Sequence, residues 1–280
     1  MLAPRRAGVK RLAGTWVVGG LPEPHRGPYN GAVPKRQYHI GCGTGDVAPR
    51  ILLCGDPGRA ERAAALLDRV RCERRNREYV TVTGSRGGHE VTVMGTGIGP
   101  DNTEIAVVEI CQIVKNPVLI RGGSSGALRR GIRLGDLVIS TGAVRLENTS
   151  TFFVPEGYPA VAHYEVVLAL RDACRSLGLR HHVGLTATAP GFYGAQSRRA
   201  AGFEPRYRDL PGELGRLGVL NFEMEVSALL TLASVRGLRA GAVCAVFADR
   251  RSGAFASPAQ RRRAEESVLR AGLTALAALS

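Results

Sequence analysis

The stretch Asn-Phe-Glu-Met-Glu at 221–225 follows a short apolar run at 217–220 and opens a segment, 226–236, with apolar residues at helical spacing. Two carboxylates flank a thioether at the start of this predicted helix. Because backbone N–H groups at a helix N-terminus keep a nearby carboxylate ionised, Glu225 could accept hydrogen bonds from a vicinal diol. Met224 would then form an apolar floor beneath the diol. Taken alone, the same residues are explained more simply as an ordinary first helical turn with a core methionine.

Strand and helix patterns alternate along the chain on both sides of this stretch. The alternation predicts a largely three-layer α/β fold, in which sites gather where strands end and helices begin. Asp101 or Asn102 is expected to cap the second helix, and the polar stretch 199–216 is interpreted as a mobile flap. The predicted strands are 51–54, 80–83, 90–95, 118–121, 137–143, 183–189 and 240–248, and the predicted helices end at 67, 114, 177, 236 and 278.

Size and charge limit the classes of partner. The chain has 280 residues, 44% of them hydrophobic, which suits one α/β domain at the upper end of single-domain size. Its net charge of +14 and pI of about 10.3 raise the question of nucleic-acid binding. The arginines are spread out and few aromatic residues lie among them, so we expect a small-anion site and no nucleic-acid partner. The apolar runs are too short to span a membrane.

Residues 1–37 are rich in Arg, Gly and Pro and show no periodicity, which predicts a disordered or loosely attached basic extension before a domain at 38–280. The six cysteines form no C-x-x-C pair, and most lie in apolar stretches. They are typical of small buried residues in a reducing compartment, so a cytoplasmic protein is expected. No cysteine or histidine spacing is typical of zinc, and no metal site is expected.

Two glycine-rich junctions carry arginines suited to an anion. Gly-Asp-Pro-Gly-Arg at 55–59 joins a predicted strand to a helix, where backbone N–H groups favour negative charge, although a plain strand-to-helix turn explains it too. Arg121 closes another apolar strand and is followed by Gly-Gly-Ser-Ser-Gly at 122–126. Burying an arginine without an anion is costly. The guanidinium, hydroxyls and free N–H groups at this junction therefore favour phosphate.

A third junction, Pro-Gly-Phe-Tyr-Gly-Ala-Gln-Ser-Arg at 190–198, suits a planar heterocycle. Its aromatic pair offers a face for stacking, and Gln196 with Arg198 offers donors and an acceptor to read the edge of a base. A surface loop that happens to contain these residues would explain the motif equally well when it is considered alone.

Together these motifs resemble those of the nucleoside phosphorylase-I family, and most closely its uridine phosphorylase branch. The resemblance runs from residue 38 to residue 250, with compatible spacing. Each motif is weak by itself, but the full set in the right order is specific. The set is Gly-Asp-Pro-Gly-Arg (55–59), Arg-Glu-Tyr (77–79), Thr-Gly-Ile-Gly (96–99), Arg-Gly-Gly-Ser-Ser-Gly (121–126), Phe-Tyr-Gly-Ala-Gln-Ser-Arg (192–198) and Asn-Phe-Glu-Met-Glu (221–225).

The resemblance implies a role for each matching residue. Arg77 matches an arginine that reaches the phosphate from a neighbouring subunit, and His39 matches a histidine that the neighbour gives to the 5′ hydroxyl. Three groups of residues match sites within one subunit: phosphate with Gly55, Arg59, Arg121 and Ser124; ribose with Met224 and Glu225; and uracil with Phe192, Gln196 and Arg198.

The family's fold is an α/β/α sandwich with a mixed, partly barrel-like central sheet. The resemblance implies a homodimer with shared active sites, in some members stacked into a hexamer. It also places Glu78 at a position that holds a monovalent cation between subunits in some members. No other cofactor is expected, because inorganic phosphate is a co-substrate. The expected reaction converts uridine and phosphate to uracil and ribose 1-phosphate.

The chemistry of the residues agrees with that reaction. Phosphate attacks the anomeric carbon of an oxocarbenium-like sugar while the base departs with negative charge. Arginines hold the phosphate dianion, and hydrogen bonds from the protein to the leaving base become stronger as negative charge develops on the base. No protein nucleophile is needed. The expected catalytic residues are Arg121, Arg198, Glu225 and Asp249.

Two departures from the family pattern leave alternatives open. Pro-Asp-Asn at 100–102 replaces the Gly-Pro-Ser of many relatives, and Asp249 stands where uridine-specific members more often have Asn. In the purine branch an Asp near this place protonates the leaving purine, so a purine nucleoside phosphorylase with Asp249 as general acid is one alternative. A nucleosidase of the same fold, which needs no phosphate, is another. A non-catalytic nucleoside-binding protein is a further alternative, and a basic nucleic-acid binder is the last.

Overall fold

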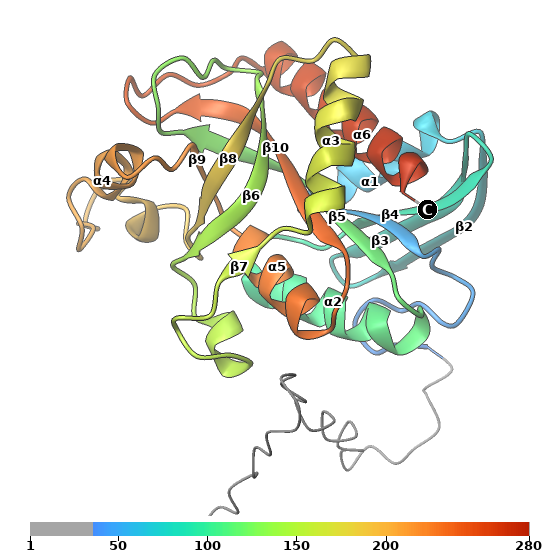
Figure 1. Cartoon of the computed structure of the whole chain (residues 1–280). Helices are drawn as coiled ribbons and strands as arrows, with labels where there is room; N and C mark the ends of the chain where they lie inside the picture. Colours follow the sequence, from blue (N-terminus) through green and yellow to red (C-terminus); the bar gives the residue numbers. More distant parts are fainter. Residues whose placement is uncertain (1–35, 280) are drawn as a thin grey trace, which may run out of the picture. The chain divides into compact units, whose positions relative to one another are not determined.

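The computed structural model describes residues 36–279 (Figure 1). Of the extension predicted at 1–37, the part up to residue 35 lies outside the described residues. Gln37 is only 4% exposed, and its backbone N–H donates to the carbonyl of Cys42 at 2.8 Å. Gln37 is therefore packed against the residues that follow it.

A single mixed sheet runs through the domain in the order β10-β6-β8-β9-β5-β1-β4-β3-β2, with β7 paired to β6. Because β10 also pairs with β5, the strands β10, β6, β8, β9 and β5 close into a barrel, and the remaining strands extend from β5. This geometry confirms the predicted mixed, partly barrel-like sheet. The strands are β1 (Arg50–Cys54), β2 (Arg69–Asn76), β3 (Tyr79–Arg86), β4 (His89–Gly95), β5 (Val118–Ala127), β6 (Leu137–Arg145), β7 (Ala160–Val161), β8 (His181–Thr188), β9 (Asn221–Glu223) and β10 (Ala240–Asp249).

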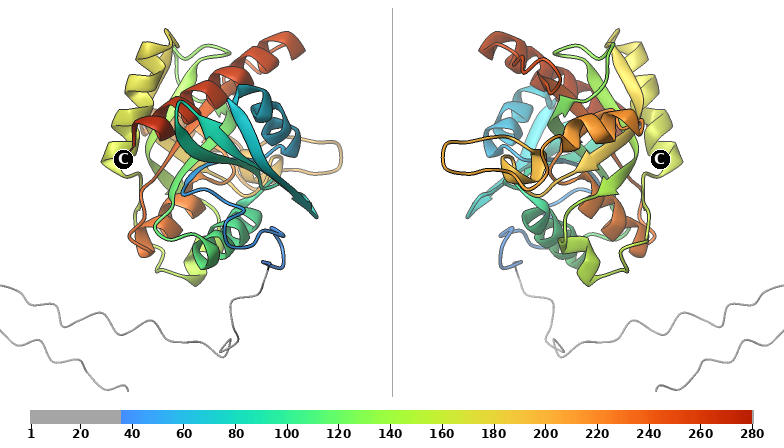
Figure 2. Two further views of the ribbon diagram at one scale, coloured as in Figure 1. Left: turned by 90° about the vertical axis from the view of Figure 1, so that its right-hand side faces the viewer. Right: turned by 90° about the vertical axis from the view of Figure 1, so that its left-hand side faces the viewer.

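Helices cover both faces of the sheet, as the three-layer prediction requires (Figure 1). Buried residues of α1, α3 and α6 share one core cluster, and those of α2 and α5 share another on the opposite face. Figure 2 shows the exposed loop before α4 standing out from one side of the domain. The helices are α1 (Pro57–Ala63), α2 (Pro100–Ile113), α3 (Tyr164–Ser176), α4 (Leu210–Arg216), α5 (Val226–Val235) and α6 (Pro258–Ala278).

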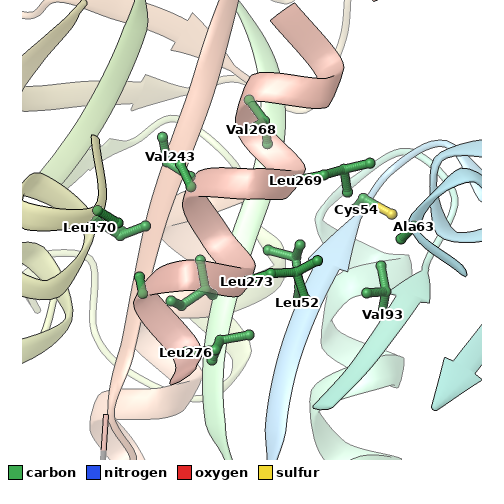
Figure 3. Close-up of a cluster of buried hydrophobic side chains, with 14 of the residues drawn as sticks. Leu52, Cys54, Ala63, Val93, Leu170, Val243, Val268, Leu269, Leu273 and Leu276 are labelled. Atoms are coloured by element: carbon green, nitrogen blue, oxygen red, sulfur yellow. The ribbon is translucent and has the colours of Figure 1, made fainter. Parts of the chain in front are cut away.

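Strand β1 shows how the sequence builds these layers. Successive side chains of a strand point to opposite faces, so an unbroken apolar run supplies both cores. Leu52 and Cys54 pack in the cluster under α6, as Figure 3 shows. Ile51 and Leu53 belong to the cluster under α2 and α5. Burial on both faces fixes the strand in the middle of the domain and places Gly55, which directly follows its C-terminal end, at the site described below.

Two local predictions are wrong. Neither Asp101 nor Asn102 caps α2, because the N-cap is Gly99, whose φ of 110° suits glycine. Residues 122–126 do not end the strand but continue β5, where they pair with β10 and, at Gly126, also with β9. The predicted flap at 199–216 includes a helix, α4, whose N-cap is Asp209.

Strand β2 was not predicted. It lies at the edge of the sheet and exposes charged side chains, so it lacks the apolar run used to find the other strands.

None of the helices in the described part of the chain has the length and apolar character needed to cross a membrane. All six cysteines are free thiols, and all but Cys111 are buried. Residues 36–279 contain no group of three or more His, Cys, Asp or Glu side chains arranged to hold a metal ion.

Candidate active site

A cavity of about 670 Å³ opens where β1, β4 and β5 meet the starts of α1, α2 and α5. Glu78, predicted near a cation, also lines this cavity. The predicted residues that line it are Gly55, Arg59, Arg121, Ser124, Phe192, Met224 and Glu225. The structure therefore brings together the residues expected to bind phosphate and those expected to bind ribose within one subunit.

Arg121 and Glu225 form an ion pair in this cavity. Nη2 of Arg121 lies 2.7 Å from Oε2 of Glu225, and their side chains are 3% and 7% exposed. Burial by itself lowers the pKa of Arg121, but the nearby carboxylates of Glu225 and Glu223 outweigh it and hold that pKa above its ordinary value. The guanidinium thus stays charged although it is buried.

The second oxygen of Glu225 is held from across the site. Oε1 accepts a hydrogen bond of 2.7 Å from the backbone N–H of Gly99, at the start of α2. The sequence predicted a carboxylate held by the N–H groups of its own helix. The structure corrects this, because Gly99 supplies the N–H that Glu225 uses. Glu225 is consequently tied to α2 and to β5 at the same time.

Glu223, and not Glu225, is the carboxylate held by backbone N–H groups at the start of α5. Its Oε2 accepts hydrogen bonds from the backbone N–H groups of Glu225 at 2.7 Å and Val226 at 2.9 Å. Its other oxygen accepts from the hydroxyl of Thr188. Burial, and then the charge of Glu225, raises the pKa of Glu223 to about 7. Glu223 therefore caps α5 and fixes the backbone that carries Met224 and Glu225.

Gly55 allows Arg121 to approach β1. A Cβ at Gly55 would lie 3.2 Å from Nη2 of Arg121, closer than side-chain contacts usually allow. Arg59, in the first turns of α1, is also buried, and its Nη1 donates to the carbonyl of Gly122 at 3.0 Å. The two predicted phosphate arginines therefore enter one cavity from α1 and β5.

Ser124 and Ser125, the two predicted serine hydroxyls, point to opposite faces of β5 because they are consecutive residues of a strand. Ser124 lines the cavity, whereas Ser125 is buried and donates to the carbonyl of Ala245 at 3.3 Å. Of the two, only Ser124 lines the cavity that holds Arg121 and Glu225, while both line the smaller cavity described below.

A second cavity of about 240 Å³ adjoins the first, since Ser124, Phe192 and Met224 line both. It also contains Gln196 and Arg198, the predicted base-reading pair. The guanidinium carbon of Arg198 lies 4.2 Å from the ring centre of Phe192. Burial lowers the pKa of Arg198. The base residues therefore lie beside the ribose residues, with an aromatic wall between the two cavities.

Arg250 is a contributor to this second site that the motifs did not reveal. Its Nη1 donates to Oε1 of Gln196 at 3.2 Å, and its Nη2 donates to the Gln196 carbonyl at 2.7 Å. Burial, and then repulsion from Arg198, lowers the pKa of Arg250 to about 10. The only sequence signal was an arginine directly after a buried strand, the same signal that marked Arg121.

Asp249 lines neither cavity. Its carboxylate accepts hydrogen bonds of 2.9 Å from the backbone N–H of Arg251 and from the hydroxyl of Ser252. Burial alone would raise the pKa of Asp249, but these hydrogen bonds outweigh it and lower that pKa. In this geometry the carboxylate stabilises the turn after β10.

His39 and Arg77 also line neither cavity. Nδ1 of His39 lies 2.7 Å from Oε1 of Glu109, and the guanidinium of Arg77 donates to the Tyr38 hydroxyl at 3.0 Å. Both residues had been expected to serve the site of a neighbouring subunit, which a single chain does not contain.

The chain is similar to several known proteins. The model of the phosphorylase superfamily matches residues 49–279. The chain is 46% identical to the uridine phosphorylase of Thermococcus kodakarensis over 230 residues, which cover 81% of this chain and 83% of the relative. It is 38% identical to the uridine phosphorylase of Escherichia coli K12, over 76% of this chain and 86% of that one. A guanosine phosphorylase of Halorubrum lacusprofundi is 33% identical, over 84% of this chain and 95% of the relative.

A solved structure gives the same result. The Trypanosoma brucei nucleoside phosphorylase, described as showing uridine phosphorylase activity, superimposes with a TM-score of 0.82 at 26% identity. The match covers 87% of this chain and 98% of that one.

Proposed function

Because the chain belongs to the phosphorylase superfamily, we propose that it catalyses the phosphorolysis of a pyrimidine nucleoside, with uridine as the expected substrate. The products are uracil and ribose 1-phosphate. The observation that carries the proposal is the contact between Arg121 and Glu225, which joins an anion site to a diol site in one cavity.

Phosphate binds between Arg59 and Arg121 in this proposal, with the hydroxyl of Ser124 as a further donor. Arg121 is buried and charged, so its electrostatic attraction for an anion is weakly screened. The arginines hold the phosphate beneath the sugar, and this fixed approach replaces an encounter in solution.

Ribose lies over Met224 with its 2′ and 3′ hydroxyls donating to Glu225. Because Glu225 is held by both Arg121 and Gly99, its carboxylate has a fixed direction before substrate arrives. A negative charge so placed also favours the positive charge that develops on the sugar ring in the transition state.

The base site favours an anionic leaving group. Arg198, Arg250 and the amide of Gln196 supply donors in or beside the second cavity. Donors aimed at developing negative charge stabilise the transition state more than the ground state. Uracil leaves with negative charge on its carbonyl oxygens; Arg198 and Gln196 line the cavity that would hold it, and Arg250 acts through Gln196.

A purine substrate is the second candidate, supported by the guanosine phosphorylase among the relatives and by Asp249. A general acid must hold a proton at the working pH, but the pKa of Asp249 is lowered and its carboxylate is bound to the turn. The geometry therefore favours the pyrimidine substrate over the purine one.

The proposed assembly is a homodimer with shared sites. His39 and Arg77 lie away from the cavities of their own subunit, so in this proposal each completes the site of a second copy. A monovalent cation near Glu78 is part of the same proposal.

Assays of uridine, thymidine and inosine, each with and without phosphate, test the function. We expect phosphate-dependent release of uracil, and weaker or no release of hypoxanthine. Faster cleavage of inosine that is lost in Asp249→Asn would instead establish the purine reaction. Base release without phosphate would establish a nucleosidase.

A further inference from the structure

Arg59 is anchored on two sides although it must also face a ligand. Its side chain is 5% exposed; Nη1 donates to the carbonyl of Gly122 at 3.0 Å, and Nη2 donates to Oε1 of Glu265 at 3.1 Å. A guanidinium carries five N–H donors in a rigid plane. Two anchors on its outer edge therefore set the direction in which the remaining N–H groups point.

Glu265 is itself held in place. Its second oxygen, Oε2, accepts from Nη2 of Arg62 at 2.8 Å, and the same Nη2 lies 2.9 Å from the carboxylate of Asp56. Oδ1 of Asp56 in turn accepts from the backbone N–H of Gly58 and caps α1. A chain of alternating charges thus runs from the first turn of α1 to α6 and back to Arg59.

Helix α6 offers a rigid support for this carboxylate. A Cβ at Gly122 would lie 2.8 Å from Cγ1 of Val268, and one at Gly272 would lie 2.6 Å from Leu52, so α6 packs directly against β5 and β1. Figure 3 shows Val268 and Leu269 among the buried side chains beside Leu52. Glu265, one turn before Leu269, is consequently fixed relative to Gly122, the other anchor of Arg59.

We propose that Glu265 is a positioning residue for phosphate binding and acts through Arg59. Glu265 lines neither cavity, so it does not touch the substrate in this assignment. The inference rests on the proposed function, because it takes phosphate to be the anion that Arg59 meets. None of the residues expected at the phosphate site comes from α6. The proposal gives this helix a part in setting the affinity for phosphate.

Charge and orientation act in opposite directions here. A carboxylate near the site reduces the local positive potential and by itself weakens attraction for an anion. The carboxylate favours phosphate binding by orienting the Arg59 guanidinium. Without this anchor, the long side chain would have to be ordered when phosphate binds. We infer that orientation outweighs charge because the guanidinium is buried and its two anchors lie on rigid elements.

The test is Glu265→Gln, which keeps the size of the side chain but removes the charged anchor. Initial rates are measured with phosphate varied at saturating uridine, and with uridine varied at saturating phosphate. We expect the KM for phosphate to rise about tenfold, with kcat and the KM for uridine within about twofold of wild type. Glu266→Gln is the matched control, because Glu266 is the exposed next residue of α6 and carries the same charge.

An unchanged or lowered KM for phosphate in Glu265→Gln would overturn the assignment. A parallel rise in both KM values, together with a lower melting temperature, would show that Glu265 only braces α6 against α1. Arg62→Gln is a second variant that removes the support of Glu265 and leaves Arg59 in place. We expect it to raise the KM for phosphate in the same direction by a smaller factor.

Phosphate binding measured calorimetrically without nucleoside separates this inference from the proposed function. If the wild-type protein binds inorganic phosphate and Glu265→Gln binds it about tenfold more weakly, the positioning role holds even where the nucleoside has been misassigned. If the wild-type protein cleaves uridine without phosphate and does not bind phosphate, the proposed function and this inference both fail. Equal phosphate affinity in the two proteins would overturn the inference alone.

Discussion

Nη2 of Arg121 lies 2.7 Å from Oε2 of Glu225, and both side chains are buried in the cavity that Arg59 also enters. The pair couples two binding steps. An anion that binds Arg121 competes with Glu225 for the guanidinium. When the anion displaces Glu225 from Arg121, a diol that donates to Glu225 supplies the carboxylate with new hydrogen bonds. Phosphate and ribose are therefore expected to bind more tightly together than separately.

Arg121→Ala should lower kcat/KM by about 10²–10³-fold, because one preorganised cation is removed from the transition state. It also leaves Glu225 buried without its partner, which should reduce the free energy of unfolding by about 3–5 kcal/mol. Steady-state kinetics and urea unfolding check the two effects. Arg130→Ala, an exposed arginine, is the control. Full phosphate-dependent turnover in Arg121→Ala would exclude Arg121 from the site.

Glu223→Gln should change the pH dependence of stability. The pKa of Glu223 is about 7 in the folded protein, above its ordinary value of 4.5, so the folded state binds the extra proton between those values. The free energy of unfolding of the wild type should therefore contain a component that is present below about pH 4.5 and is lost as the pH rises through 7. The glutamine is neutral throughout; its oxygen can accept from the backbone N–H groups of Glu225 and Val226, and its NH2 group can donate to the Thr188 hydroxyl oxygen, so it should lack this loss.

Urea unfolding of wild type and Glu223→Gln at pH 5 and pH 8 measures the difference. The variant should gain stability relative to wild type at pH 8. A difference between the two proteins that is the same at both pH values would contradict a raised pKa at this position.

Arg250→Leu should lower kcat/KM for uridine by about 10–100-fold, because Gln196 loses two charge-assisted hydrogen bonds. The KM for phosphate should change little, since Arg250 lies beside the base cavity. Arg251→Leu is the matched control, because its side chain is exposed. Equal losses in both variants would show that general charge, and not the contact with Gln196, is responsible.

Gly99→Ala should raise the KM for the nucleoside. Gly99 has a φ of 110° and its N–H holds Oε1 of Glu225, while a Cβ there would meet nothing within 4 Å. The effect is therefore conformational strain, of about 1–2 kcal/mol, at the point that orients Glu225. Gly131→Ala is the control, since Gly131 has a φ of 86° and equally open space. Similar nucleoside KM values in the two variants would argue against this role of Gly99.

The alternation of strands and helices predicted the three-layer α/β fold, and the motifs at strand ends predicted the family; the partly barrel-like sheet was implied by the resemblance to that family. Gly55 and Arg121 end apolar runs that pair in parallel, so their meeting in one cavity follows from local patterns. The roles assigned to the residues of this cavity remain predictions, and the Arg121→Ala and Gly99→Ala variants test those of Arg121 and Glu225.

Long-range partners could not be predicted in this way. Glu225 is held by Gly99, and Gln196 by Arg250, through contacts that no local pattern encodes. The glycines at 122–126 were interpreted as a turn because glycine usually marks one locally. In the structure they lie within a central strand, where Gly122 and Gly123 leave room for Val268 and for the thiol of Cys244.

The central claim is that phosphate, held by buried arginines, attacks the sugar. Phosphorus NMR of uridine mixed with the protein and inorganic phosphate tests it most directly, with uracil measured in the same sample. The account predicts one ribose 1-phosphate for each uracil released, and no uracil when phosphate is left out. Uracil released with free ribose, and with the phosphate signal unchanged, would contradict it.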